Sequence, residues 1–500
     1  MDMGGWKGRR AQAWAIAMAS FGLATLVSAG VMPNLFPFID PTGTVATYNA
    51  AGKIDTSNPF FQSLGTNGRS CATCHIAGNA FGLSVGNVQS RFAATQGHDP
   101  LFAAVDGADC PDATPGDPAS HSALLTHGLI RVGLEVPAAA QFTIRAVRDP
   151  FGCALVTDPV TGRQTASVYR RPLPTANLRF LSGVMFDGRE TVSPLNNPAT
   201  FQANLLTDLK HQSVDATLGH AQAQSAPTEE QQAAMVAFEM GLTSAQSSDR
   251  LAGPLSVVGA SGGPMPLVTQ ASHPGINDTL GMDPAGTPFS PEVFSLFTSW
   301  QNAPGGLGPS RKAIAAGETL FNTHPLTISN VRGLNDNPAV AAALGKTLPI
   351  SGFQGTCTTC HNTPNVGNHS FPLPLDIGTG HDAVNESDTQ VANAIARLDQ
   401  PDVPVFEIDG CPNPFPDPRQ PDAPYVVYTT DPGRALITGL CTDVNRVKGP
   451  ILRGLAARAP YFHNGAARDV GEVVNFYNER FQMNLSDQEK SQLAAFLNSL

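Results

Sequence analysis

The pentapeptides Cys71-Ala72-Thr73-Cys74-His75 and Cys357-Thr358-Thr359-Cys360-His361 carry the strongest structural signal in this chain. In each, two thiols lie three positions apart and a histidine follows the second thiol directly. This spacing lets both thiols bond to the vinyl groups of one haem and places the histidine at the iron. We therefore predict two covalent haem c groups, attached through Cys71, Cys74, Cys357 and Cys360, with His75 and His361 as iron ligands.

A single Cys-x-x-Cys pair has other interpretations. A zinc site needs four ligands in a tetrahedral arrangement. A redox-active dithiol has no need of a histidine at the same relative position. Two complete copies in one chain favour haem over both alternatives.

The amino terminus has the three parts of an export signal. A basic stretch at residues 6–10 precedes an apolar run over residues 11–26, and Val27-Ser28-Ala29 forms a small-residue cleavage site. An uncleaved anchor is the alternative, because the run approaches the roughly 18 apolar residues that a membrane span needs. The glycine, serine and threonine within the run favour a signal peptide over residues 1–29, and hence export to the periplasm.

Export also fits the four cysteines outside the haem motifs, because an oxidising compartment lets thiols pair. They are even in number: Cys110, Cys153, Cys411 and Cys441. We expect sequence neighbours to pair, Cys110 with Cys153 and Cys411 with Cys441. Two other connectivities stay open.

Length and composition exclude some classes of protein. A chain of 500 residues is too long for one compact core. The formal net charge of −11 leaves no basic footprint, so we expect no nucleic-acid partner. Charged residues are only 14%, while 48 glycines and 42 prolines indicate many turns and long irregular connections.

Helical patterns dominate the local signals. Residues 311–321 place apolar side chains on one face. Residues 228–246 start with a capping box of Thr228 and Gln231, and a last helix starts at Ser486 with Glu489 completing a second box. Strand signals are weak and scattered.

We therefore predict a mainly α fold with two cytochrome c-like haem domains, long loops and insertions. The expected divisions are an N-terminal haem domain over residues 30–250, a Gly-, Pro- and Ser-rich linker or insertion over 251–300, and a C-terminal haem domain over 301–500.

Three segments resemble the bacterial dihaem cytochrome c peroxidase and MauG family. Phe186-Asp187-Gly188-Arg189 is similar to its Trp-Asp-Gly-Arg motif. The run from Lys448 to Arg453, followed by Ala459-Pro460-Tyr461-Phe462-His463-Asn464-Gly465, is similar to its Pro-x-Leu-Arg and Pro-Tyr-x-His-Asp-Gly run. The C-terminal helix is the third segment. The resemblance covers about half of the mature chain. Residues 85–170 and 250–300 match nothing in the family pattern.

The resemblance implies that the N-terminal haem reacts with peroxide and the C-terminal haem is six-coordinate and relays electrons. In classical members of the family, a methionine is the second ligand of the C-terminal haem. The matching position in this chain is Tyr477, and MauG-like members also have tyrosine there. A phenolate stabilises ferric and higher-valent iron, whereas a thioether stabilises ferrous iron. Met483 is the competing ligand, and a surface role for Tyr477 is the remaining alternative.

The peroxide-reacting site departs from the family pattern. Gln212 fits the distal glutamine, but the position of the distal glutamate holds Gln222, which cannot shuttle a proton. His220 is the candidate for this acid–base function, and Asp215 is a weaker one. Histidines with no role beyond an exposed helix or loop are the alternative.

Further expectations follow from the resemblance. Phe186 replaces the bridging tryptophan, and because phenylalanine is harder to oxidise, this replacement disfavours electron hopping at this point. Arg171 stands where the family's calcium site uses asparagine, which leaves calcium open because a fixed cation conflicts with a bound ion. His98 is a candidate distal ligand, with an ordinary turn as the alternative. Arg189 and Arg453 are candidates for binding haem propionates, or for salt bridges.

These features predict a periplasmic dihaem oxidoreductase that reacts with hydrogen peroxide. Its electrons would come from a small redox protein, a cytochrome c or a cupredoxin, or from an organic substrate. A non-catalytic electron-transfer cytochrome and a dihaem oxygenase are the alternatives.

Overall fold

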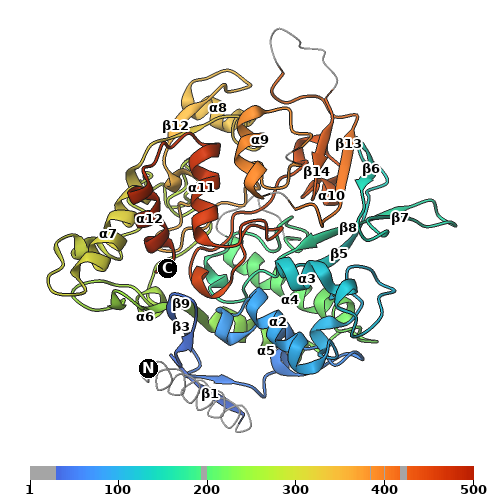
Figure 1. Ribbon diagram of the computed structural model, residues 1–500, viewed down its shortest axis with the longest axis horizontal. Coiled ribbons are helices and arrows are strands. Elements are labelled where there is room, and N and C mark those ends of the chain that lie inside the picture. Colours follow the sequence, from blue (N-terminus) through green and yellow to red (C-terminus); the bar gives the residue numbers. More distant parts are fainter. Residues whose placement is uncertain (1–29, 193–199, 383, 399, 417–424) are drawn as a thin grey trace, which may run out of the picture.

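The computed structural model describes residues 30–192, 200–382, 384–398, 400–416 and 425–500. The predicted signal peptide lies outside these residues. Helices and strands are intermixed along the chain (Figure 1). The helices are α2 (Val85–Thr95), α3 (Ser122–His127), α4 (Phe201–Gly219), α5 (Glu229–Gly241), α6 (Met265–Val268), α7 (Gly308–Thr323), α8 (Pro338–Leu344), α9 (Thr389–Ile395), α10 (Ala435–Thr438), α11 (Val470–Arg480) and α12 (Asp487–Leu497).

The strands form five small sheets, all with antiparallel pairing. Two sheets have two strands each: β1 (Val31–Pro33) with β4 (Lys53–Asp55), and β11 (Leu326–Ile328) with β12 (Phe353–Gly355). The four-stranded sheet has the order β10 (Gly253–Pro254), β9 (Leu242–Asp249), β3 (Gly43–Asn49) and β2 (Phe38–Ile39). The two three-stranded sheets have the orders β5 (Ile130–Glu135), β8 (Gln164–Arg170), β7 (Leu155–Thr157) and β14 (Val427–Thr429), β13 (Val405–Asp409), β6 (Thr143–Arg148). This is more sheet than the sequence patterns indicated, because short strands pair with distant segments and leave little local alternation.

The helix expected over residues 228–246 is shorter than predicted. Its capping box at Thr228 and Gln231 is present, but α5 ends at Gly241. The following residues form β9, which pairs with β3 from Gly43↔Asp249 to Asn49↔Leu242. Glycine is a poor helix former, and pairing with β3 buries the residues beyond it. The expectation of helix beyond residue 241 was therefore wrong.

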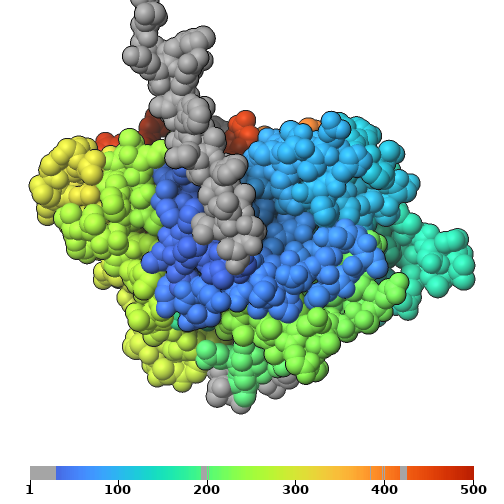
Figure 2. All heavy atoms as spheres, turned by 90° about the horizontal axis from the view of Figure 1, so that it is seen from below, coloured from blue at the N-terminus to red at the C-terminus, as the bar shows by residue number. Residues whose placement is uncertain are grey.

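Two sheets join segments that lie far apart in the sequence. Strand β6 of the N-terminal half pairs with β13 of the C-terminal half, and β3 pairs with β9. Figure 2 shows the N-terminal segment in blue lying against the green middle of the chain on one face. Strands of both halves therefore share a sheet. The division into two cytochrome c-like domains remains a prediction.

Residues 251–300, expected to be a linker or insertion, contribute to the main hydrophobic core. Leu255, Phe294, Phe297 and Trp300 are fully buried and pack in one cluster with residues of α7 and α12. Glu318 of α7 accepts hydrogen bonds from the backbone amides of residues 296 and 297 at 2.6 and 2.9 Å. This stretch is an integral part of the C-terminal half, despite its loop-like composition.

The helices predicted over residues 311–321 and from Ser486 are confirmed as α7 and α12, the latter with its Ser486–Glu489 capping box. These helices pack closely at Gly317, where a Cβ atom would lie 2.1 Å from the carbonyl oxygen of Gln492. Only a residue without a side chain allows this approach.

Replacing Gly317 by alanine should therefore destabilise the protein by about 1–3 kcal/mol, because the added methyl group forces the helices apart. The melting temperature measures the effect. Gly306→Ala is the control, since a Cβ atom there meets nothing within 4 Å. Equal melting temperatures for the two variants would contradict a close contact between α7 and α12.

The sequence-neighbour disulfides are confirmed: the structure bonds Cys110 to Cys153 and Cys411 to Cys441. Cys411 and Cys441 pack in a core cluster with residues of β6, β8 and β13. Within the described ranges, every helix is too short or too polar to cross a bilayer.

Candidate haem sites

Both haem motifs have the same local structure. Cys71–Thr73 forms a single 3-10 turn, and the amide of Ser70 donates to Thr73 Oγ1 at 3.0 Å. The amide of His75 then donates to the carbonyl of Cys71 at 3.0 Å. The same bonds, at the same lengths, recur around Cys357–Thr359. The fold thus presents two thiols and a histidine in one geometry twice.

Each motif histidine is held in the tautomer that an iron ligand requires. His75 Nδ1 donates to the carbonyl of Phe81 at 3.2 Å, and His361 Nδ1 donates to the carbonyl of Gly367 at 2.5 Å. Nε2 is therefore left unprotonated and free to bind a metal. Burial lowers the pKa of both imidazoles to about 4, which keeps them neutral.

The four motif thiols are free of disulfide bonds. Burial raises the pKa of Cys71, Cys357 and Cys360 to about 12 and that of Cys74 to about 11. A redox-active Cys-x-x-Cys motif has a lowered thiol pKa. The residues present therefore fit thioether attachment of haem better than dithiol redox chemistry.

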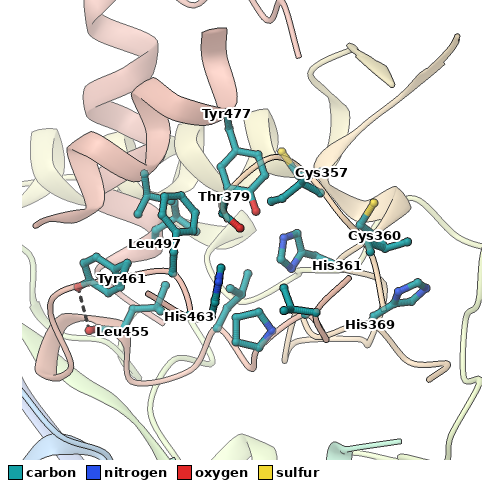
Figure 3. A pocket seen from close by; sticks show the side chains of 18 of the residues that line it. Cys357, Cys360, His361, His369, Thr379, Leu455, Tyr461, His463, Tyr477 and Leu497 are labelled. Atoms are coloured by element: carbon teal, nitrogen blue, oxygen red, sulfur yellow. Dashed lines mark hydrogen bonds between the residues drawn. The ribbon is translucent and has the colours of Figure 1, made fainter. Parts of the chain in front are cut away.

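The second motif opens into an apolar cavity (Figure 3). Helices α11 and α12, strand β11 and the loop after Val447 supply its walls. Its aliphatic and aromatic lining includes Phe321, Leu326, Ile328, Val331, Val474, Phe481, Leu493 and Leu497. Such a lining suits a flat apolar macrocycle.

Tyr477 of α11 faces this cavity together with His361. Their ring centroids lie 6.4 Å apart, and Figure 3 shows the phenol oxygen directed into the space beside His361. Burial raises the pKa of the Tyr477 hydroxyl. An ionised phenol here would need a positive partner such as a metal ion. Tyr477 is thus partly buried and faces the cavity, and its role as an iron ligand stays a prediction.

Met483, the competing ligand, also lines the cavity and is buried. It packs in the main apolar cluster, which is an adequate reason for its presence. Sequence reasoning missed another member of this cavity, His369, both of whose ring nitrogens are buried and form no hydrogen bond with the described residues. Its Nε2 atom lies 3.6 Å from Asp278 Oδ1. No spacing rule in the sequence marks His369.

His463 of the Pro-Tyr-x-His segment lines the same cavity. Its ring meets Phe186 edge to face at 6.0 Å, and its Nε2 atom lies 3.7 Å from Asp431 Oδ2. Asp431 in turn accepts two hydrogen bonds from Arg170. The two resembling segments, around residues 186 and 463, thus meet at one wall of the cavity.

The first motif lies against a cluster of phenylalanines. Phe60 is 6.4 Å from the His75 ring and 4.9 Å from Phe238, measured between ring centroids. Cys71 and Ala72 pack against the same cluster, which α5 and the turn at Pro59–Phe61 supply. The surroundings of the first haem motif are therefore apolar, like those of the second.

Two of the three predicted distal residues lie beside this motif. The side-chain amide of Asn67 donates to the carbonyl of His220 at 2.8 Å and to Gln222 Oε1 at 3.3 Å. The chain passes so closely here that a Cβ atom on Gly65 would lie 1.8 Å from the carbonyl oxygen of Ala221. His220 is also near enough to His75 for its charge to lower the pKa of His75.

His220 has a carboxylate partner that the sequence did not reveal. Its Nδ1 atom is hydrogen-bonded to Asp106 Oδ2, and the other oxygen of Asp106 pairs with Arg69. Both partners are buried, while the His220 side chain is 40% exposed. Asp106 fixes the tautomer of His220, which leaves Nε2 available to exchange a proton.

Gln212, the third predicted residue, lies on α4, two helical turns before the C-cap residue His220 and about 12 Å away along the axis. The structure therefore does not bring Gln212 to the place of His220 and Gln222. Asp215 instead lies near His211, with 4.0 Å between Oδ2 and Nδ1, and His211 Nδ1 is 2.8 Å from Glu190 Oε2.

The remaining candidates, Arg189, Arg453 and His98, have different surroundings. Arg189 pairs with Asp187 at 2.9 Å, which favours its role as a salt bridge. Arg453 is buried and donates to the carbonyls of Asn365 and Gly263, while its Nε atom has no partner among the described residues. His98 is exposed just after α2, in agreement with an ordinary turn residue.

Comparison with curated proteins finds a similar protein, the cytochrome-c peroxidase IdrP2 from Denitromonas iodatirespirans. It is 30% identical over 154 residues, which make up 29% of this chain and 36% of the relative. The match thus spans about a third of the length of that relative. No family model matches the sequence, and no solved structure matches the fold. The similarity supports the resemblance to cytochrome-c peroxidases and does not extend to MauG.

Proposed function

We propose that this chain is a periplasmic dihaem c-type oxidoreductase that reacts with hydrogen peroxide. His75 would hold the haem that reacts with peroxide, and His361 with Tyr477 would hold the haem that supplies storage or relay of electrons. The observation that carries the proposal is the pairing of His361 and Tyr477 across one apolar cavity, beside a second motif of identical local geometry. The similarity to a cytochrome-c peroxidase supports it.

The residues divide the work in a defined way. Cys71, Cys74 and His75 would hold one haem, and Cys357, Cys360 and His361 would hold the other. When bound, the haems supply the one-electron and peroxide chemistry that amino-acid side chains lack. The chain supplies orientation, exclusion of water and proton transfer.

Proton transfer is the step that the first site needs. Cleavage of a peroxide O–O bond requires a group that takes the proton from one oxygen and delivers it to the other. His220, held by Asp106, has a free Nε2 atom for this purpose, whereas Gln222 has no proton to exchange. The reducing electrons come from a small redox protein, a cytochrome c or a cupredoxin, or from an organic substrate.

Electron paramagnetic resonance of the oxidised protein tests the proposal. We expect one high-spin and one low-spin ferric signal, of which the high-spin signal changes when peroxide is added. Two low-spin signals that do not respond to peroxide in either redox state would instead indicate an electron carrier. Product formation under oxygen without peroxide would indicate an oxygenase.

Replacing Tyr477 by methionine should raise the reduction potential of the C-terminal haem by hundreds of millivolts, within the roughly 0.8 V that axial ligands span. The reason is that a thioether favours ferrous iron, whereas a phenolate favours ferric iron. Spectroelectrochemical titration measures the shift.

Tyr461→Phe is the matched control, because Tyr461 lines the same cavity but donates its hydroxyl to the carbonyl of Leu455 at 2.9 Å. The reduction potential of the C-terminal haem in Tyr461→Phe should equal that of the wild type. An unchanged potential in Tyr477→Met, together with a shift in Met483→Leu, would make Met483 the ligand.

A further inference from the structure

Arg171 lies where the two halves of the chain meet. It directly follows β8, and its backbone amide donates to the carbonyl of His463 at 2.7 Å. Its side chain is 6% exposed and reaches the wall of the cavity that holds His361 and Tyr477. A charged group at this depth requires an explanation.

Four backbone carbonyls surround the guanidinium of Arg171. Nη1 donates to Gly128 at 2.9 Å and is 3.4 Å from the carbonyl of His127. Nη2 donates to Arg458 at 2.8 Å and also to Leu83. A Cβ atom on Gly128 would lie 1.8 Å from Nη1, so the chain leaves room for this side chain by placing glycine there. The carbonyls come from both halves of the chain.

No carboxylate balances this charge among the described residues. The ion pairs of the structure leave Arg171 out, and its charged neighbour is another cation, Arg458. Burial and the charge of Arg458 lower the pKa of Arg171 to about 9. Among the described residues, backbone carbonyls therefore hold the cation.

A calcium ion does not fit at this place. Calcium prefers oxygen ligands such as backbone carbonyls. Here four such carbonyls already face the guanidinium of Arg171. An ion bound to the same oxygens would lie a few ångströms from a fixed positive charge in a poorly screened interior. The calcium that the family resemblance left open has no place beside Arg171.

We infer that Arg171 is a resident cation that joins the two halves of the chain at the wall of the second haem cavity, and that this junction is independent of calcium. Arg171 acts as a positioning residue: it holds the segment around residue 458, which lines the cavity, against the segments around residues 83 and 128. The inference goes beyond the proposed function, since its tests do not measure peroxide activity.

The full-length haem protein provides the first test. Its melting temperature and the optical spectrum of its C-terminal haem should be the same after treatment with a calcium chelator and after addition of millimolar calcium chloride. A loss of stability on chelation that calcium restores would overturn the inference.

The second test removes the guanidinium. Arg171→Asn leaves the four carbonyls without a donor and adds an amide oxygen. We expect its melting temperature to fall by about 5 °C or more. Calcium chloride should then restore part of the loss, because the carbonyls regain a cation.

Arg179→Asn is the matched control. Within the described residues, Arg179 also donates to backbone carbonyls alone, those of Leu267 and Gln270, but it does not line the cavity. This variant should show no response to calcium. If Arg171→Asn melts like the wild type, or if both variants respond equally to calcium, the carbonyls around Arg171 form no cation site and the inference fails. Should Arg171→Asn not fold, the chelator experiment on the wild type still decides.

Discussion

Replacing Cys71 and Cys74 together by serine should leave one covalent haem on the chain and abolish its reaction with peroxide. Serine hydroxyls form no thioether with the vinyl groups, so His75 loses the haem that it would otherwise bind. The haem at Cys357 and Cys360 should be retained, because its motif folds through its own local hydrogen bonds. The pyridine haemochrome spectrum counts the haems per chain, and stopped-flow absorbance follows the reaction with peroxide.

The control for this experiment removes two other thiols from the same half of the chain. Cys110 and Cys153 form a disulfide, and replacing both by serine should cost about 2–5 kcal/mol of stability. That variant should keep both haems in whatever fraction folds. Two haems on the Cys71/Cys74 variant, or fewer than two on the wild type, would contradict covalent attachment at both motifs.

The haem motifs are the part of the site that a single sequence can predict, because their geometry is local. The turn of Cys71–Thr73 and the bond from His75 to Phe81 involve residues within a few positions of one another. Helix starts are similarly local, and the capping boxes at Thr228 and Ser486 form as predicted. What these features share is that nearby residues satisfy one another's hydrogen bonds.

The rest of the site depends on contacts between distant segments, which local patterns do not encode. Asp106 meets His220 only because the chain folds the two segments together, and no spacing rule indicates it. His369 enters the second cavity in the same way. The role expected for Tyr477 rests on a family resemblance and not on the sequence around it.

Composition does not show how one long segment packs. Residues 251–300 are rich in glycine, proline and serine, which usually indicates a connection. Their few large apolar residues, such as Phe297 and Trp300, are nevertheless fully buried in the core beside α7 and α12. Burial of a few aromatic side chains is enough to fix such a segment, since each removes a large apolar area from water.

Replacing His220 by glutamine should slow the reaction with peroxide by about 10²- to 10⁴-fold, the usual effect of losing a general acid–base group. Glutamine keeps a polar side chain of similar length that can bond to Asp106, but it cannot take up and release a proton near neutral pH. The loss should therefore fall on the rate with peroxide, while both haems and their spectra stay unchanged. Stopped-flow kinetics at several peroxide concentrations separate a slower reaction step from weaker peroxide binding.

His211→Gln is the appropriate comparison for that variant. His211 lies on α4, which His220 caps at its C-terminal end. Like His220, it bonds to a carboxylate through Nδ1, and its side chain is 46% exposed against 40% for that of His220. The two histidines differ in location. His211 is bonded to Glu190, whereas His220 contacts the segment just before the first haem motif. A large loss in His220→Gln and none in His211→Gln would locate proton transfer at His220. Equal rates in both variants and in the wild type would show that another group moves the proton, and the dyad of Asp106 and His220 would then have only a structural role.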